Sequence, residues 1–257
     1  MKACFWKTLL CAAAVLLAAA CTHEMKTAVA ADEGVIPLEG YEDIGCRWSY
    51  SMEYVAGGVS RSVADGINRT IARAVCSQEE ENTSADVPAA CLQWIDGIQD
   101  EYYAFADEVL PELDVDDEPW MMGWWYDQAG AFSGGCEARH LCTYSINYED
   151  YTGGAHGMRG NYYYVFDTKT GAQVTEEDLF AEDCDTEALE DLIYDRLLEG
   201  LDEEAWQAVY ERPTLNGNFS VDEDGITWWY NAYEIAPYVL GTLSSPLTWA
   251  ELAPFLK

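Results

Sequence analysis

The stretch that decides the fold is YTGGAHGMRGNYYYVFDTKTGAQVTEEDLF, residues 151–180. Its first part predicts a sharp turn, because Gly153, Gly154 and Gly157 crowd around His156. Glycine readily adopts positive φ angles and lets two backbones approach closely. His156 is therefore expected inside a tight turn, where it serves either as a functional group or as a structural partner of the backbone.

Beyond the turn, aromatic residues occupy both alternating sets of positions, which predicts a strand at 161–167 with two apolar faces. The segment DTKTG at 167–171 predicts a hairpin-type turn with Gly171 in the left-handed region. Thr175 and Asp178 form a capping-box pattern, which predicts the start of a helix. The stretch thus predicts a turn, a strand, a second turn and a helix start.

On the C-terminal side, Leu189, Ile193 and Leu197 lie on one stripe and predict an amphipathic helix over 186–200. The acidic turn at 222–225 separates two short apolar runs and predicts a β-hairpin. The other elements expected here are a helix at 203–210, a strand at 238–243 and a short helix at 248–256.

On the N-terminal side, Val63, Ile67 and Ile71 recur at every fourth position and predict a helix over 62–76. A longer helix is expected over 88–110. Strands are expected at 36–55, 120–132 and 140–148. The aromatic run at 120–126 has two interpretations: packing within the core or a sheet, which we favour, or an exposed platform for a sugar.

Five motifs occur in a fixed order: YTGGAHG, FDTKTG, TEEDLF, DGITWWYNAYEIAPYVLG and TWAELAPFL. Together they resemble the RsiV-type extracytoplasmic domain, a family found in bacterial lipoproteins, in a lysozyme-sensing anti-sigma factor and ahead of some peptidoglycan deacetylase domains. The resemblance covers residues 144–257, and residues 35–143 resemble the companion region that precedes this domain. It implies an α+β fold with helices packed on an antiparallel sheet, a location in the cell envelope, and protein binding as the activity.

The N-terminus is expected to direct export. Residues 1–20 combine early lysines with an apolar run too short to span a bilayer comfortably, which is typical of a signal peptide. Small residues directly before Cys21 resemble a bacterial lipoprotein box, so Cys21 is the expected lipidation site and residues 21–34 the expected tether. Cleavage after the A-x-A pattern at 28–30 is the alternative. On the first interpretation the protein is a periplasmic or outer-membrane-anchored lipoprotein that meets the membrane only through its lipid.

Six cysteines remain in the exported chain, and an even number there predicts disulfides that staple the fold. Two pairings are suggested by position: Cys76 with Cys91 between the two expected helices, and Cys136 with Cys142, which flank the turn between two expected strands. Zinc is the less favoured alternative, because no C-x-x-C pair is present. The six candidates are Cys46, Cys76, Cys91, Cys136, Cys142 and Cys184.

The chain of 257 residues has a formal charge of −34, from 47 acidic and 13 basic residues. This charge argues against nucleic acid, because phosphate binding needs clustered lysine and arginine. It favours encounter with a basic partner. Acidic loops at 114–118 and 222–225 lack the spacing of a calcium loop, so solvated turns are expected, with no metal and no cofactor.

We therefore expect a non-catalytic binding module whose partner is a basic, lysozyme-like protein or peptidoglycan. The alternative is an enzyme or accessory domain acting on peptidoglycan glycan. The sequence has no G-x-S-x-G or H-E-x-x-H motif, and His156 is the one candidate general base in a suggestive setting. The candidate binding residues are Tyr151, Gly153, Gly154, His156, Tyr233 and Glu234.

Overall fold

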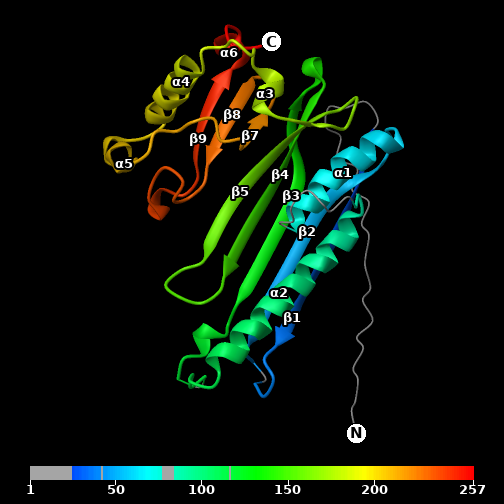
Figure 1. Ribbon diagram of the computed structural model, residues 1–257, viewed down its shortest axis with the longest axis vertical. Helices are drawn as coiled ribbons and strands as arrows, with labels where there is room; N and C mark the ends of the chain where they lie inside the picture. Colours follow the sequence, from blue (N-terminus) through cyan, green and yellow to red (C-terminus); the bar gives the residue numbers. More distant parts are fainter. Residues whose placement is uncertain (1–24, 42, 77–83, 116) are drawn as a thin grey trace.

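The computed structural model describes residues 25–41, 43–76, 84–115 and 117–257, which form a large and a small sheet (Figure 1). The large sheet has the strand order β1-β2-β3-β4-β5-β6. Its strands are β1 (Lys26–Pro37), β2 (Gly45–Gly57), β3 (Trp125–Cys136), β4 (Leu141–Tyr151), β5 (Met158–Asp167) and β6 (Gln173–Val174). The expected signal peptide at 1–20 and the expected lipidation site Cys21 lie outside the described residues.

The large sheet is mixed, whereas an antiparallel sheet was expected. Strands β2 and β3 are parallel, with Arg47 opposite Trp125, and the neighbouring pairs β1–β2 and β3–β4 are antiparallel. The reason is the long connection between β2 and β3, which contains the helices α1 (Arg61–Val75) and α2 (Val87–Val109). Such a crossover returns the chain to the start of the sheet and makes the next strand parallel. The α+β class is confirmed, and the purely antiparallel sheet is wrong.

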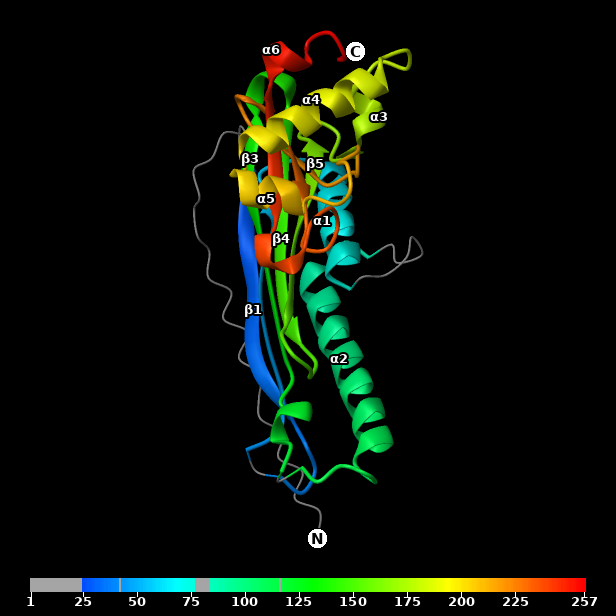
Figure 2. The same ribbon diagram turned by 90° about the vertical axis from the view of Figure 1, so that its left-hand side faces the viewer.

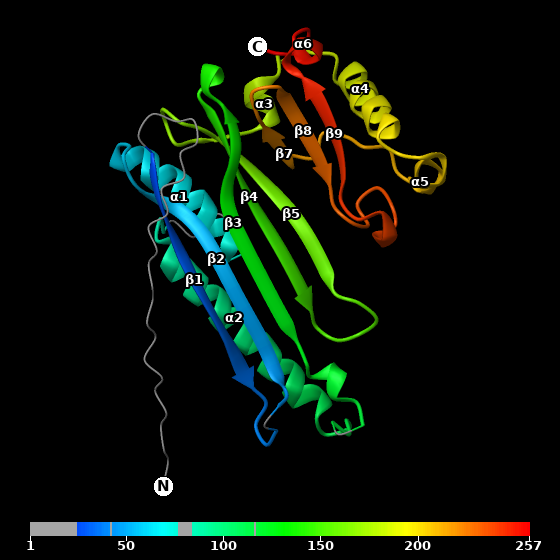
Figure 3. The same ribbon diagram turned by 180° about the vertical axis from the view of Figure 1, so that it is seen from behind.

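Helices α1 and α2 lie along one face of the large sheet (Figure 2). They lie in front of the strands in Figure 1 and behind them in the opposite view (Figure 3). Both helices begin at a side-chain cap: Ser60 Oγ accepts from the Val63 amide at 3.3 Å, and Asp86 Oδ1 accepts from the Ala89 amide at 3.0 Å. Their predicted positions are confirmed within one or two residues. None of the helices in the described ranges has the length and apolarity needed to cross a bilayer.

Apolar side chains fill the space between these helices and the sheet. The expected stripe of α1 is buried there, with Ile67 and Ile71 fully covered against Met52 and Phe166. Tyr144 is also fully buried, and its hydroxyl donates to the carbonyl oxygen of Glu53 at 2.7 Å, which satisfies its polar end.

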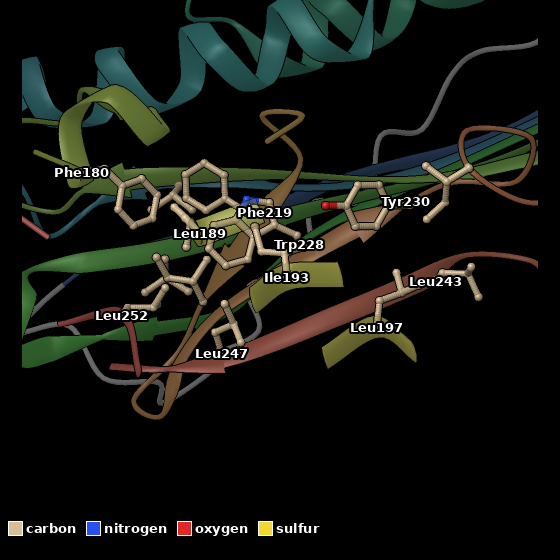
Figure 4. Packing of buried hydrophobic residues seen from close by; sticks show 14 of the residues in the cluster. Phe180, Leu189, Ile193, Leu197, Phe219, Trp228, Tyr230, Leu243, Leu247 and Leu252 are labelled. Atoms are coloured by element: carbon tan, nitrogen blue, oxygen red, sulfur yellow. The ribbon is translucent and has the colours of Figure 1, made fainter. Parts of the chain in front are cut away.

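The small sheet is antiparallel and has its own core around Trp228 (Figure 4). Leu189 and Ile193 of the expected amphipathic helix are fully buried against it. This helix begins at Asp185, which accepts from the Ala188 amide at 3.1 Å. The elements of this region are β7 (Phe219–Val221), β8 (Gly225–Tyr230), β9 (Leu243–Thr248), α3 (Glu176–Leu179), α4 (Thr186–Glu199), α5 (Glu203–Ala208) and α6 (Trp249–Leu252).

Polar side chains join the two sheets. Thr143 Oγ1 on β4 donates to the Val221 carbonyl oxygen and accepts from the Val221 amide, both at 2.8 Å. Asn218 Oδ1 accepts from the Tyr163 amide on β5 at 2.9 Å. The boundary expected between residues 143 and 144 remains a prediction, and β4 runs across it.

Two expected elements differ from the structure. Residues 26–34 of the expected tether belong to β1, which pairs with the outer edge of β2 along its whole length. This pairing satisfies backbone groups that would otherwise form a bare edge, and it needs little apolar burial. The strand expected at 238–243 is instead the 3₁₀ turn η3 (Tyr238–Leu240), because Pro237 opens the turn and Gly241 closes it at φ +66°. Two further 3₁₀ turns are η1 (Pro119–Met121) and η2 (Glu137–Arg139).

The expected disulfides are not formed: all six cysteines in the described part of the chain are free thiols. The Cys136–Cys142 pairing fails because the two side chains leave opposite faces of the sheet. Cys136 packs in the core of the small sheet and Cys142 packs under the helices. The Cys76 thiol is directed to the Ala90 carbonyl oxygen at 3.1 Å rather than bonded to Cys91.

Burial also disfavours the reactive thiolate form of three of these cysteines. It raises the pKa of Cys46, Cys91 and Cys142 to about 12, so they stay protonated at neutral pH. Cys76 and Cys184 are partly exposed. We therefore expect iodoacetamide to modify these two before the four buried cysteines, Cys46, Cys91, Cys136 and Cys142, in the native protein.

Peptide mapping by mass spectrometry after timed alkylation measures this order. Alkylation in guanidinium chloride is the control, since all six thiols then react. A disulfide among the six in a non-reducing map, or equal native rates for Cys142 and Cys184, would contradict the thiol assignment.

Candidate functional site

The turn between β4 and β5 has the backbone that its glycines predict. Gly153 and Gly154 have φ angles of +91° and +97°. The Tyr151 hydroxyl closes the turn by donating to the Gly154 carbonyl oxygen at 2.9 Å. Tyr151, Gly153 and Gly154, three of the expected binding residues, therefore shape the turn. The turn presents a fourth, His156, at its exposed end.

Hydrogen bonds indicate which nitrogen of the neutral His156 ring carries the proton. Nδ1 lies 2.9 Å from the Gly157 carbonyl oxygen, which can only accept, so Nδ1 carries a proton. In the neutral ring Nε2 is then an acceptor, and the Tyr233 hydroxyl lies 3.4 Å from it as the donor. The ring also stacks on Tyr238, with centroids 4.3 Å apart and planes 23° apart. His156 is thus held in place by two tyrosines from the loop between β8 and β9.

Tyr233 has an unusual backbone. Its φ angle is +68°, and His140 is the one other non-glycine residue of the described ranges with a positive φ. Such a conformation strains a bulky residue and is sustained only when its surroundings determine it. Here the Tyr233 amide donates to the Ala236 carbonyl oxygen at 3.0 Å, and the Tyr210 hydroxyl donates to the Tyr233 carbonyl oxygen at 2.6 Å.

The result is an exposed cluster that we call the His–Tyr patch, made by His156, Tyr210, Tyr233, Tyr238 and Val239. The exposed fractions are 58% for Tyr210, 51% for Tyr233 and 85% for Val239. The Tyr238 hydroxyl donates to the Gly157 carbonyl oxygen at 3.0 Å, which ties the two loops together. The patch is therefore a fixed apolar and aromatic surface that spans both sheets.

Glu234 does not belong to this patch, although it follows Tyr233 in the sequence. One of its carboxylate oxygens accepts from the Asn231 amide at 2.8 Å, and the other accepts from Asn216 Nδ2 at 2.6 Å. Asn231 also accepts from the Asn161 amide on β5 at 2.9 Å. Glu234 thus stabilises the loop that presents Tyr233, and both of its carboxylate oxygens are bonded to that loop and to Asn216.

A second candidate site lies between the helix pair and the large sheet, and no sequence pattern indicated it. It is a groove of about 780 Å³, which we call the helix–sheet groove. Alternate positions on each strand share one face of the sheet. The side chains on the face toward the helices form the floor of the groove. The floor residues are Tyr126, Gln128, Ile146, Tyr148, Asp150, Tyr162 and Tyr164, and the helices add Thr70, Arg73, Gln93, Trp94, Ile98 and Glu101.

Strand register sets the order of the floor. Tyr126 on β3 lies opposite Asp150 on β4, and Gln128 lies opposite Tyr148. Tyr148 faces Gly160 on β5, and the missing side chain there lets its ring stack on Tyr162 with centroids 5.8 Å apart. The floor is thus aromatic, with a carboxyl and an amide set among the rings.

The groove is a partly desolvated environment for its ionisable groups. Burial raises the pKa of Asp150, and the nearby Glu101 carboxylate raises it further, while a backbone bond with Met158 lowers it. Burial also raises the pKa of Tyr148 and Tyr164 to about 12. The Tyr126 hydroxyl donates to Glu101 Oε2 at 3.4 Å, which connects the floor to α2.

The residues of the aromatic run at 120–126 have two different roles, one in the core and one in the lining of the groove. Trp124 is buried, with 3% of its surface exposed, and its indole nitrogen donates to the Met121 carbonyl oxygen at 2.9 Å. Tyr126 instead lines the groove. Its pairing with Asp150 depends on a strand register that local sequence does not encode. Packing within the core is therefore confirmed for Trp124.

These observations define an α+β protein in which a helix-backed mixed sheet is followed by a small antiparallel sheet with helices of its own. Residues 177–250, which contain the small sheet, match the model of the family described as "Protein of unknown function (DUF3298)". The match is confined to this segment of the chain.

Two solved structures share the overall fold. A member of the DUF3298 family from Bacteroides fragilis NCTC 9343 aligns with a TM-score of 0.75 at 20% identity, over 91% of this chain and 94% of that one. A DUF3298 family protein from Pseudomonas aeruginosa PAO1 aligns with a TM-score of 0.65 at 17% identity, over the same shares, 91% and 94%. No curated protein matches the sequence.

Proposed function

We propose that this protein is an exported, lipid-anchored cell-envelope protein of the RsiV type, and that it acts as a non-catalytic module that binds a basic, lysozyme-like protein through the His–Tyr patch. The observation that carries the proposal is the exposed aromatic surface on a backbone held at a strained angle. Tyrosines of this kind are enriched among the residues that dominate binding energy at interfaces. Their rigidity reduces the entropy lost on binding.

Charge complementarity supports the choice of a basic partner. The chain carries a formal charge of −34, so its field attracts a positively charged protein and accelerates their encounter at low ionic strength. The patch itself supplies apolar contact rather than charge. We therefore expect the acidic surface to attract the basic partner, and Tyr210, Tyr233 and Val239 to make the specific contacts with it.

The test is a titration with a c-type lysozyme, followed by calorimetry and by lysozyme activity. We expect saturable binding that weakens as salt rises. The variant Tyr233→Ala is expected to weaken binding at least about tenfold, which corresponds to about 1.4 kcal/mol. The matched control is Tyr103→Ala on α2, because Tyr103 is also an exposed tyrosine, 39% accessible, outside the patch.

Absence of binding at low ionic strength would overturn the proposal. So would equal losses in Tyr233→Ala and Tyr103→Ala, because the patch would then have no special role. Binding to purified peptidoglycan without binding to lysozyme would replace the protein partner by a wall component.

A further inference from the structure

We infer that the helix–sheet groove is a binding site for an organic ammonium group, carried either by a small free amine or by a lysine side chain of a peptide. The groove shares no residue with the His–Tyr patch, so this inference is independent of the function proposed above. Its volume of about 780 Å³ falls within the range of ligand pockets.

The first argument is that the groove offers hydrogen-bond acceptors that lack donors. Gln128 is 92% buried, since 8% of its surface is exposed, and its Oε1 has no hydrogen-bond partner in the described structure. Its Nε2 donates to the Val75 carbonyl oxygen at 3.4 Å, which leaves Oε1 as the free end. Asp150 Oδ1 is likewise buried without a partner. Buried polar atoms are normally satisfied, so the groove calls for a ligand that brings donors.

The second argument is the sign of the charge beside these acceptors. Asp150 and Glu101 both line this end of the groove, and Tyr126 lies between them, opposite Asp150 in the sheet and bonded to Glu101. Arg73, the one arginine among the described lining residues, lies close enough to Tyr164 to oppose the rise in its pKa that burial causes. Tyr164 pairs with Tyr144, six residues before Asp150 along β4, a separation of about 20 Å at about 3.3 Å per residue. The carboxylate end is therefore left for a cation.

The third argument is the aromatic lining. Trp94 on α2 meets Tyr126 edge to face, with centroids 6.5 Å apart, and Tyr148 and Tyr162 present a stacked pair on the floor. Aromatic faces attract ammonium groups within about 6 Å of the ring centre, and the attraction grows as water is excluded. An alkylammonium ion satisfies all three features, because it donates hydrogen bonds, carries positive charge and has an apolar stem.

The experiment is calorimetric titration of the protein with cadaverine, with a tri-lysine peptide and with 1,5-pentanediol. Cadaverine and pentanediol share a five-carbon chain, so they differ mainly in the charge of their ends. We expect saturable binding of cadaverine or of the peptide, and at least about tenfold weaker binding of the diol. The stronger ligand of the first two identifies the source of the ammonium group.

Two variants test the residues. Asp150→Asn and Glu101→Gln are each expected to weaken ammonium binding about tenfold or more. Glu101 is exposed, so its substitution keeps the test valid even where Asp150→Asn reduces folding. The matched control is Glu108→Gln, which removes an exposed carboxylate from the same helix outside the groove. It is expected to leave affinity unchanged.

Three outcomes would overturn the inference: no saturable binding of cadaverine or tri-lysine, equal binding of 1,5-pentanediol, or equal effects of Glu101→Gln and Glu108→Gln. The second outcome would point to a neutral polyol or sugar. The third would reduce the effect to the general charge of the protein.

Discussion

Replacing Trp228 with alanine is expected to lower the free energy of unfolding by about 3–5 kcal/mol, the range measured for large aromatic residues truncated in cores. Trp228 is fully buried at the centre of the small sheet, with Phe180 stacked against it at 6.1 Å between ring centroids. Figure 4 shows residues of α4, β8 and β9 converging on it. Its removal leaves a cavity that these elements cannot fill by small shifts.

The same substitution also removes a hydrogen bond. Trp228 Nε1 donates to Glu176 Oε1 at 2.8 Å, and this bond opposes the rise in the Glu176 pKa that burial causes. The variant Trp228→Phe keeps most of the ring volume and loses the donor, so it is expected to cost less than the alanine variant. Both variants lose this bond, so the difference between their unfolding free energies measures the packing of the ring.

Urea denaturation followed by circular dichroism measures both losses. The control is Trp206→Ala on α5, because 45% of Trp206 is exposed and its removal should cost well under 1 kcal/mol. A loss below about 1.5 kcal/mol for Trp228→Ala would mean that the core of the small sheet collapses around the cavity, contrary to the packing described.

Local periodicity predicted the helices of this protein well. The stripe of Ile67 and Ile71 in α1 and that of Leu189 and Ile193 in α4 place both helices correctly, because helix formation depends on neighbours three and four residues apart. The capping box of Thr175 and Asp178 is also present. These features are encoded within one or two helical turns, and a single sequence is enough to find them.

Features that depend on distant partners were missed. Strand β1 carries few buried residues, so it lacks the alternation that marks a half-buried strand, and its stability comes from pairing with β2. The parallel β2–β3 pair arises from the path of two helices rather than from any residue in either strand. Cys136 and Cys142 are close in sequence, yet strand alternation points their side chains to opposite faces.

The same division holds for the two candidate sites. The glycines around His156 predicted its turn, but the contact with Tyr233 joins residues 77 positions apart. The groove is harder still to foresee, because Gln128, Asp150 and Glu101 come from two strands and a helix and are unremarkable one by one. Sequence patterns identified the presenting turn, and tertiary packing supplied the partners.

Replacing Gly171 with alanine is expected to destabilise the protein by about 2–5 kcal/mol, from two separate causes. Gly171 has a φ angle of +75°, and a left-handed backbone costs an L-residue about 1–2 kcal/mol. An added Cβ would also lie 2.7 Å from Val63 Cα and closer still to the Val63 carbonyl oxygen. Overpacking of this kind costs about 1–3 kcal/mol.

Gly154→Ala is the matched control, because Gly154 has a φ angle of +97° and an added Cβ there meets nothing within 4 Å. The control carries the backbone cost alone, so the difference between the two unfolding free energies measures the contact between the turn at Gly171 and α1. Gly66 of α1 shows the same closeness from the other side, since a Cβ there would lie 2.6 Å from the Gly171 carbonyl oxygen.

Equal losses in the two variants would contradict a tight contact and would mean that α1 yields to a methyl group. A larger loss for Gly171→Ala has a second consequence, because α1 supplies Thr70 and Arg73 to the helix–sheet groove. A methyl group that pushes α1 away from the turn changes the width of the groove, whereas Gly154→Ala leaves α1 in place. Ammonium affinity is therefore expected to change in the Gly171 variant and not in the Gly154 variant, which calorimetry on the two folded proteins would measure.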